Sequence, residues 1–413
     1  MLTELVCIVC GQSYPPGDVQ TCPACGPSGI LDARYDYDAT RAVLSLSELN
    51  TRPHDHWRYR ELLPIRPDAS LPPLLVGWTP VYEAPRLAQH VGVRRLFLKD
   101  DGRNPTGSFK DRASSVGVLK ALEFGYDTIA CASTGNAASS LAGLSASVGL
   151  RSMIFVPERA PEPKIAQLLV FGATVFRVKG TYEQAFDLCR SACERFTWYN
   201  RNSGTNPYLV EGKKTAGLEI AEQFATGSWM GGGLPDWVVV SVGDGCTIGA
   251  IGKGLHEFKR LGLVTTMPRL LGVQAEGASP IVRAFQTKSD VASSASDTLA
   301  DSIAVGTPRN WRRALAWIRA SRGTMVAVSD AAILDALLVT ARLGGVFGEP
   351  AGVAGVAGLQ RAVADGLVPR DATALVVVTG NGLKDIRSAT EAAGRPHNVR
   401  PDLADVEAVV SPG

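Results

Sequence analysis

The segment that decides the fold is KDDGRNPTGSFKDR, residues 99–112. It follows an alternating apolar pattern over residues 94–99 that is typical of a short strand, and its centre has the composition of a turn. Apolar residues then recur at helical spacing over residues 113–122, which predicts Lys110 at a strand-to-helix corner. A helix start and a dry pocket would both lower the pKa of its amine and make it a nucleophile. The alternative is a solvated surface lysine.

The string from Asn104 to Arg112 resembles the lysine segment of fold-type II pyridoxal-phosphate enzymes, and within them of threonine synthases. The resemblance implies that Lys110 carries pyridoxal 5′-phosphate (PLP) as a Schiff base and acts as acid and base, with Phe109 beside the ring. It also implies a tryptophan synthase β-like α/β fold, in which two open twisted domains hold the cofactor between them, and a homodimer.

Composition excludes several classes of partner. The 413 residues are 45% hydrophobic and 20% charged, which is ordinary for a globular protein. The formal charge of +2 does not indicate nucleic acid or a membrane surface as a partner. No apolar run approaches the roughly 20 residues of a membrane helix, and the first residues lack a secretion signal. We therefore expect a cytoplasmic protein with a small-molecule substrate.

Two Cys-x-x-Cys pairs stand within the first 30 residues, Cys7 with Cys10 and Cys22 with Cys25. Four thiolates in two pairs suit a tetrahedral structural zinc site, and so small a segment has little core of its own. We predict a zinc-ribbon-like segment over residues 1–30 without a catalytic role. Redox or disulfide pairs are the alternative, which a reducing compartment disfavours.

The rest of the chain divides by composition. Residues 31–77 show little periodicity and many prolines, which predicts an extended arm. A catalytic region is expected over 78–400, with a smaller subdomain of about 111–205 inserted in a larger domain, and a tail over 401–413.

Short apolar strands alternate with helix-length segments, which favours α/β layers around largely parallel sheets. Predicted strands are 128–133, 152–157, 174–178, 237–242, 270–275, 325–329 and 374–379; predicted helices are 137–148, 165–171, 182–196 and 330–343; the predicted mobile loop is 289–302.

A strand runs into a helix through Ser133-Thr134-Gly135-Asn136. Free N–H groups at a helix start, together with two hydroxyls, form a cradle for a carboxylate; an ordinary helix cap is the alternative. The string is similar to the loop with which the family grips the amino-acid carboxylate. The same resemblance implies that Asn136 contacts the ring hydroxyl of the cofactor.

Glycines at 243, 245 and 249 link another strand to a helix and would let the backbone close around a phosphate. A loose dinucleotide fingerprint that ends near Glu276 is the competing interpretation. By resemblance this is the loop for the cofactor phosphate, formed by Gly243, Asp244, Gly245, Cys246 and Thr247. Threonine synthases more often have asparagine where Asp244 and Thr247 stand.

The last strand ends in Thr379-Gly380-Asn381-Gly382, which resembles a family segment that has histidine in place of Asn381. Thr379 would be the partner of the pyridine nitrogen. A neutral hydroxyl does not hold that nitrogen protonated as a carboxylate does, so the cofactor would suit elimination and replacement. Glu349-Pro350-Ala351-Gly352 is also family-like, although a helix start explains it nearly as well.

Residues 202–215 resemble the segment that binds the substrate phosphate, which implies Asn202, Ser203 and Lys213 as ligands. The arginine of well-known members aligns with Leu209. Arg103, Arg201 or Lys213 would then supply the positive charge, because a buried dianion requires partners. Surface charge on a helix is the alternative for Lys213 and its neighbour Lys214.

The predicted reaction is that of a threonine synthase, a PLP-dependent carbon–oxygen lyase of threonine biosynthesis. It removes phosphate from the γ-carbon of O-phosphohomoserine and adds water at the β-carbon. Within the same fold, the alternatives are a threonine or serine dehydratase and a cysteate-synthase-like β-replacement enzyme acting on O-phosphoserine. From other classes, a nucleotide-dependent oxidoreductase and a non-catalytic regulator that binds a partner through the zinc ribbon also remain open.

Overall fold

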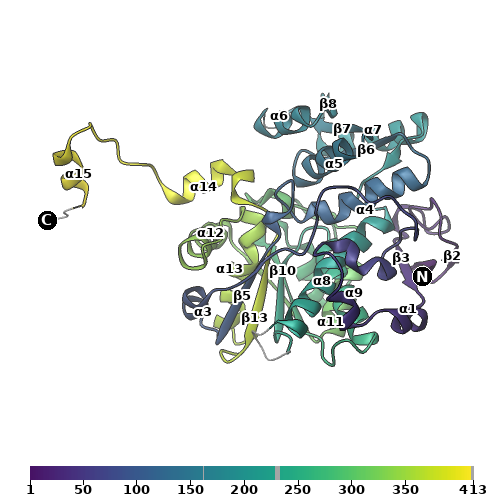
Figure 1. Ribbon diagram of the computed structural model, residues 1–413. Coiled ribbons are helices and arrows are strands. Elements are labelled where there is room, and N and C mark those ends of the chain that lie inside the picture. Colours follow the sequence, from purple (N-terminus) through teal and green to yellow (C-terminus); the bar gives the residue numbers. More distant parts are fainter. Residues whose placement is uncertain (161, 228–232, 411–413) are drawn as a thin grey trace.

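The computed structural model describes residues 1–160, 162–227 and 233–410, and within them the strands form three sheets (Figure 1). The expected α/β architecture is confirmed, because two of these sheets are covered by helices on both faces. None of the described helices is long and apolar enough to cross a membrane.

The largest sheet has the strand order β12-β11-β10-β13-β5-β4, and its neighbouring strands are parallel except β4 with β5. Alternate residues of the inner strands pack into two hydrophobic clusters, one with α8, α9 and α11 and the other with α3, α12 and α13. Helices on both faces explain why β10 and β13 read as continuous apolar runs. The strands are β4 (Val81–Glu83), β5 (Arg95–Asp100), β10 (Trp237–Ser241), β11 (Arg269–Ala275), β12 (Thr324–Val328) and β13 (Thr373–Val378).

The second sheet is entirely parallel, in the order β8-β7-β6-β9. One of its faces packs against α5 and α6, with α4 (Lys110–Glu123) behind them, and the other packs against α7. This sheet and its helices lie between β5 and β10 in the sequence. Its elements are β6 (Thr128–Ala132), α5 (Asn136–Ser147), β7 (Arg151–Pro157), α6 (Glu162–Val170), β8 (Thr174–Val178), α7 (Tyr182–Phe196) and β9 (Tyr199–Asn200).

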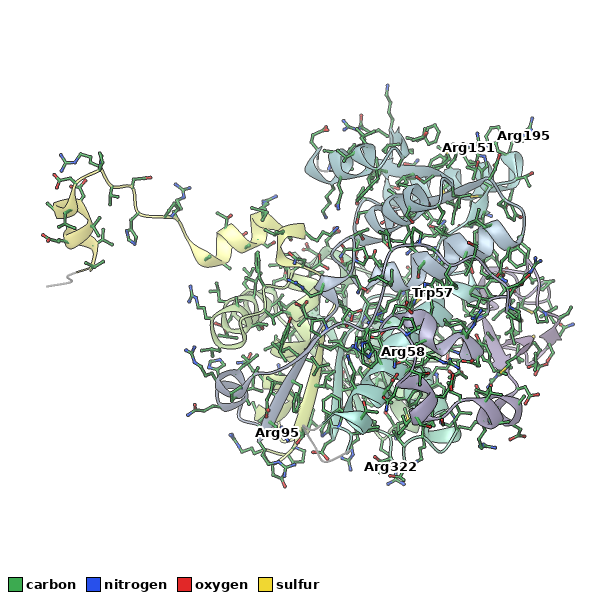
Figure 2. All side chains as sticks on the ribbon, viewed as in Figure 1. Trp57, Arg58, Arg95, Arg151, Arg195 and Arg322 are labelled. Carbon is green, nitrogen blue, oxygen red and sulfur yellow. The ribbon has the colours of Figure 1, made fainter. Side chains whose placement is uncertain are left out.

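The N-terminal sheet is antiparallel, in the order β2-β1-β3, with β1 (Leu2–Cys7), β2 (Ser13–Tyr14) and β3 (Leu31–Tyr35). β3 lies in the range expected to be an extended arm, and its pairing with β1 extends the N-terminal sheet beyond residue 30. The arm continues through α1 (Tyr37–Val43), α2 (Leu46–Leu49) and the 3₁₀ helix η2 (His56–Leu62). η2 buries Trp57 and Arg58 against the body, whereas Arg151 and Arg195 lie at the surface (Figure 2).

The predicted strands and helices all occur, with ends within three residues of the predicted ones. The longest described helix, α8 (Pro207–Thr226), had not been predicted. Residues 207–224 are all buried, so the helix shows no amphipathic period. The remaining elements are α3 (Pro85–Val91), η3 (Asp101–Arg103), α9 (Cys246–Arg260), η5 (Glu276–Ala278), α10 (Pro280–Thr287), η6 (Asp301–Ile303), α11 (Trp311–Ala320), α12 (Asp330–Gly344), α13 (Pro350–Ala364), η7 (Gly382–Lys384), α14 (Ile386–Ala393), α15 (Leu403–Val410) and η1 (Gly26–Ser28).

Candidate active site

A cavity of about 900 Å³ lies between the large and the small domain. Its size is in the range of pockets that hold a cofactor or a small substrate. Strand ends and helix starts of both domains line it, as expected for α/β sheets. Each residue that we predicted for the cofactor or the substrate lines this cavity: Phe109, Lys110, Ser133, Thr134, Gly135, Asn136, Asn202, Ser203, Lys213, Gly243, Asp244, Gly245, Cys246, Thr247 and Thr379.

Lys110 is the first residue of α4 and lines the cavity together with residues of both domains. Its Nζ makes no hydrogen bond or ion pair with any described residue. Burial, followed by the positive charges of Lys213 and Arg201, lowers the pKa of the Lys110 amine to about 8. The alternative of a solvated surface lysine is therefore wrong, and the amine loses its proton easily enough to act as a nucleophile or base.

Two helices, α5 after Gly135 and α9 after Gly245, begin at the cavity without a side-chain cap. The first N–H groups of a helix have no partner within the helix, and its dipole is positive at that end. A polar ligand can therefore take these donors. By contrast, α7 and α8 begin with the side-chain caps Thr181 and Asn206.

The backbone of the turn before α9 is tightly packed against the segment around Asn310. Gly245 has φ +93°, and a Cβ there would lie 2.8 Å from the carbonyl oxygen of Asn310. The Asp244 carboxylate accepts hydrogen bonds from the Arg309 backbone N–H at 2.6 Å and from Asn310 Nδ2 at 3.1 Å. Asp244 thus fixes the neighbouring segment, and the backbone N–H groups of the turn stay available for a phosphate.

A positively charged wall faces this turn. Arg201 and Lys213 are each 1% exposed. The Arg201 guanidinium donates to Ser114 Oγ at 2.9 Å and to Ser203 Oγ at 3.1 Å. The Lys213 ammonium has no hydrogen-bond or ion-pair partner among the described residues, and burial lowers its pKa. An unpaired buried ammonium costs free energy unless an anion joins it, so this wall suits an anionic ligand.

The surface-charge alternative is wrong for both neighbouring lysines of α8. Lys214 is fully buried and forms ion pairs with Glu211 at 2.7 Å and with Glu257 at 2.9 Å. Lys213 points to the cavity instead. The two adjacent lysines therefore have different surroundings, one paired and one unpaired.

Leu209 does not reach the cavity. Its side chain is fully buried and packs against Gly117 of α4, close to the Cγ of Arg201. Arg103 is exposed and lies outside the cavity lining. Of the three proposed substitutes for the missing arginine, Arg201 and Lys213 are thus the two that line the cavity.

Two polar residues of the site were missed in the sequence, Glu349 and Ser302. Asn136 Nδ2 donates to Glu349 Oε1 at 2.7 Å and to Ser302 Oγ at 3.3 Å. Burial raises the pKa of Glu349 to about 7. The Glu349-Pro350 string had been noted without a role, and Ser302 is the last residue of the predicted loop 289–302, which carries no motif. Glu276, which the dinucleotide interpretation requires, is exposed and does not line the cavity.

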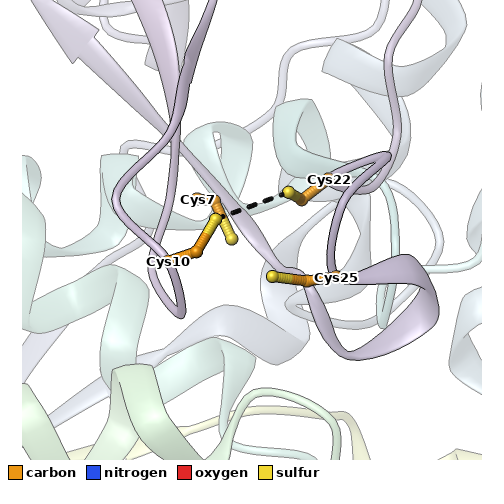
Figure 3. A group of neighbouring side chains, drawn as sticks. All are labelled: Cys7, Cys10, Cys22 and Cys25. Carbon is orange, nitrogen blue, oxygen red and sulfur yellow. Dashed lines mark hydrogen bonds between the residues drawn. The ribbon is translucent and has the colours of Figure 1, made fainter.

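The four N-terminal cysteines converge on one point, as Figure 3 shows. Their sulfur atoms lie within 4.8 Å of one another, and none forms a disulfide. Cys10 Sγ and Cys22 Sγ are 3.7 Å apart. Tetrahedral coordination with zinc–sulfur bonds of about 2.3 Å places sulfur atoms about 3.8 Å apart, so the spacing fits a metal ion.

The fold and the cavity define an enzyme that holds PLP between two α/β domains, the fold-type II class. Solved structures with this fold include a threonine deaminase from Solanum lycopersicum, with a TM-score of 0.65 and 22% identity over 77% of this chain and 88% of that one. Another is the diaminopropionate ammonia lyase of Escherichia coli, with a TM-score of 0.65 and 18% identity over 85% and 92%.

The model of the pyridoxal-phosphate dependent enzyme family matches residues 73–380. The threonine synthase of Methanocaldococcus jannaschii is 37% identical over 96% of each chain, and that of Methanosarcina acetivorans is 40% identical over 95% of each. The threonine synthase of Synechocystis is 38% identical over 84% of this chain and 87% of its own. The chain belongs to the pyridoxal-phosphate dependent enzymes and, within them, to the threonine synthase family.

Proposed function

We propose that this chain converts O-phosphohomoserine and water into threonine and inorganic phosphate. The observation that carries the proposal is the buried ammonium of Lys213, which has no ion-pair partner among the described residues and lines the same cavity as Arg201 and Lys110. The starts of α9 and α5 provide donors for the cofactor phosphate and the substrate carboxylate, so the two buried cations can serve a second phosphate. The kinship with threonine synthases supports the same substrate.

The cavity fits PLP. The uncapped start of α9, from Gly243 to Thr247, offers backbone donors for the cofactor phosphate. Phe109 would lie beside the ring, Thr379 would contact its nitrogen and Asn136 its hydroxyl. When bound, PLP supplies an electron sink that stabilises negative charge on the substrate carbons.

Lys110 is proposed to hold the cofactor and then to move protons. Its Nζ takes the proton from the α-carbon of the substrate and returns protons along the side chain, for which a pKa of about 8 is well placed. The bond between the γ-carbon and the phosphate oxygen breaks, and a proton lost from the β-carbon is replaced by one delivered to the γ-carbon, which becomes the methyl group. The hydroxyl of a water molecule joins the β-carbon, the other proton of that water leaves with the phosphate, and the α-carbon regains its proton. The uncapped start of α5, with Ser133, Thr134 and Gly135, would hold the carboxylate.

The phosphate of the substrate is proposed to lie against Asn202, Ser203 and Lys213, with Arg201 as a further cation. Arginine binds phosphate in a forked geometry, whereas lysine acts as a point charge. Arg201, eight residues before Leu209 in the chain, thereby takes the place of the arginine that other family members have at that position.

We further propose that Cys7, Cys10, Cys22 and Cys25 hold a structural zinc ion. Four protein ligands leave no open coordination position for catalysis. A division into residues 1–30, 31–77, 78–400 and 401–413, a homodimer and a cytoplasmic location stay predictions from the sequence. Metal analysis of the purified chain and of a Cys10→Ser, Cys22→Ser variant tests the zinc site.

A substrate panel tests the reaction. O-phosphohomoserine should yield threonine and phosphate in equal amounts, whereas threonine and serine should yield little keto acid. Keto acid as the main product would identify a dehydratase. Product formed only from O-phosphoserine and a second nucleophile would identify the β-replacement alternative.

A further inference from the structure

The loop between the two cysteine pairs, residues 15–20, contacts the body of the protein next to the cavity. The Gly17 N–H donates to Tyr208 Oη at 3.1 Å, and Tyr208 Oη donates to the Gly17 carbonyl at 2.5 Å. Gln20 Nε2 donates to the Asn200 carbonyl at 3.3 Å. Tyr126, which precedes β6, donates to Asp18. The loop therefore contacts both domains.

Asn200 and Tyr208 flank residues 201–206, which we call the anion loop because they include Arg201 and Ser203. Asn206 Nδ2 donates to the Asn200 carbonyl at 3.1 Å, so that carbonyl joins the anion loop to Gln20. The Asn206 side chain also caps α8 by accepting from the Tyr208 N–H at 3.1 Å. Both ends of the anion loop are thus tied to residues that loop 15–20 holds.

Tyr208 connects this contact to the positively charged wall in a second way. It lies in the first turn of α8, the helix that carries Lys213 a little more than one turn later. Tyr208 is only 1% exposed, so its hydroxyl exchanges hydrogen bonds with Gly17 rather than with water. A shift of this turn would move Lys213 and the anion loop together.

We propose that loop 15–20 positions the anion loop for the phosphate of the substrate, and that Tyr208 is the positioning residue that carries this effect. The proposal rests on the proposed function, because it assigns the phosphate to the anion loop. The segment with the four cysteines then has a role in the active site without touching the substrate. Whatever holds the four sulfur atoms together also fixes the ends of loop 15–20.

The test is the variant Tyr208→Phe, which keeps the ring and removes the hydroxyl. Tyr199→Phe is the matched control, because Tyr199 is also 1% exposed and its hydroxyl lies near Asn206 of the anion loop without completing a hydrogen bond to any described residue. In the PLP-loaded enzyme, Tyr208→Phe should raise the KM for O-phosphohomoserine about fivefold and change kcat less than twofold. The inhibition constant of inorganic phosphate should rise by the same factor.

Hydrogen exchange gives a readout that does not depend on turnover. Peptides covering residues 200–206 should exchange faster in Tyr208→Phe than in Tyr199→Phe, because the anion loop loses an anchor. Gln20→Ala removes the other anchor at a partly exposed position and should produce the same two effects more weakly.

The results separate the two proposals. Equal phosphate affinity and equal exchange of residues 200–206 in Tyr208→Phe and Tyr199→Phe would overturn the positioning role, and so would a loss of kcat with unchanged KM. A wild-type enzyme that neither uses O-phosphohomoserine nor binds phosphate would overturn the proposed function instead. In that case, the exchange measurement would still decide whether loop 15–20 holds residues 200–206.

Discussion

Two regions of this protein hold lysines in opposite surroundings. At the contact between the N-terminal segment and α8 and α9, Lys214 pairs with Glu211 and Glu257, and Lys253 pairs with Glu211 and Asp32, at distances of 2.7 to 3.0 Å. In the cavity, Lys110 and Lys213 are without carboxylate partners among the described residues. The first region is complete within the folded chain, whereas the second requires a ligand.

The contrast is sharpest at two adjacent positions. Lys213 and Lys214 follow each other in α8, so their side chains leave the helix about 100° apart and enter different surroundings. Burial of a charged side chain therefore does not by itself indicate a binding site. A buried charge indicates one when it has no oppositely charged partner in the folded chain. The unpaired charges line the same cavity as the uncapped starts of α5 and α9.

Removing Lys110 should have the largest effect on activity. We expect Lys110→Ala to lower threonine formation at least about 1,000-fold, because the variant loses both the group that holds the cofactor and the base. Its free energy of unfolding should not fall, since the lost amine has no partner in the cavity. Steady-state kinetics and urea denaturation measure both quantities, and a variant that keeps more than a tenth of its activity would contradict the role.

In the region where the lysines form ion pairs, removing a lysine should lower the free energy of unfolding. Lys214→Met leaves two buried carboxylates without their shared cation and should cost about 3–5 kcal/mol of unfolding free energy. Lys213→Met, one residue earlier, is the control and should cost nothing or stabilise the protein. Equal losses in both variants would remove the distinction between the two regions.

The variant Lys213→Met also tests whether the unpaired lysine binds the substrate. Lys213→Met should raise the KM for O-phosphohomoserine about 10- to 100-fold, because it removes a buried charge that faces the phosphate. Kinetics with O-phosphohomoserine, together with inhibition by inorganic phosphate, measure this effect. A KM within twofold of the wild-type value would show that Lys213 does not bind the substrate.

The pH dependence of stability should be the most gradual of these effects. The pKa of Lys110 falls from 10.5 to about 8 on folding, so the unfolded chain binds this proton more tightly. The stability of the cofactor-free protein should therefore rise between about pH 8 and pH 10.5, by about 1 kcal/mol per pH unit at most from this group. The difference between wild type and Lys110→Met isolates the effect, and parallel pH profiles would contradict the shifted pKa.

The sequence sufficed where the determinants are local. Turn residues, a strand and a helix flank Lys110 within twenty positions and place it at a strand-to-helix corner, whereas its role as the cofactor lysine came from the resemblance of residues 104–112 to the family segment. The glycines before α9 mark a tight backbone turn in the same way. The α/β layers followed from short apolar runs. These features depend on neighbours in the chain, which a reader of the sequence sees directly.

Other parts depend on contacts between distant residues. The surroundings of Lys213 and Lys214 differ because Glu257 lies 43 positions away from one of them in the chain and close to it in space. Glu349 reaches Asn136 across 213 positions. α8 escaped prediction because it is buried on all sides, which removes the periodicity that identifies a helix at the surface.

The most direct test of the account is to find which lysine holds the cofactor. The PLP-loaded protein would be reduced with borohydride, digested and mapped by mass spectrometry, with the buried Lys99, Lys213, Lys214 and Lys253 as internal controls. The account predicts the reduced cofactor on Lys110 and on none of these four. A label on one of the four instead, or no label on a protein that makes threonine, would contradict it.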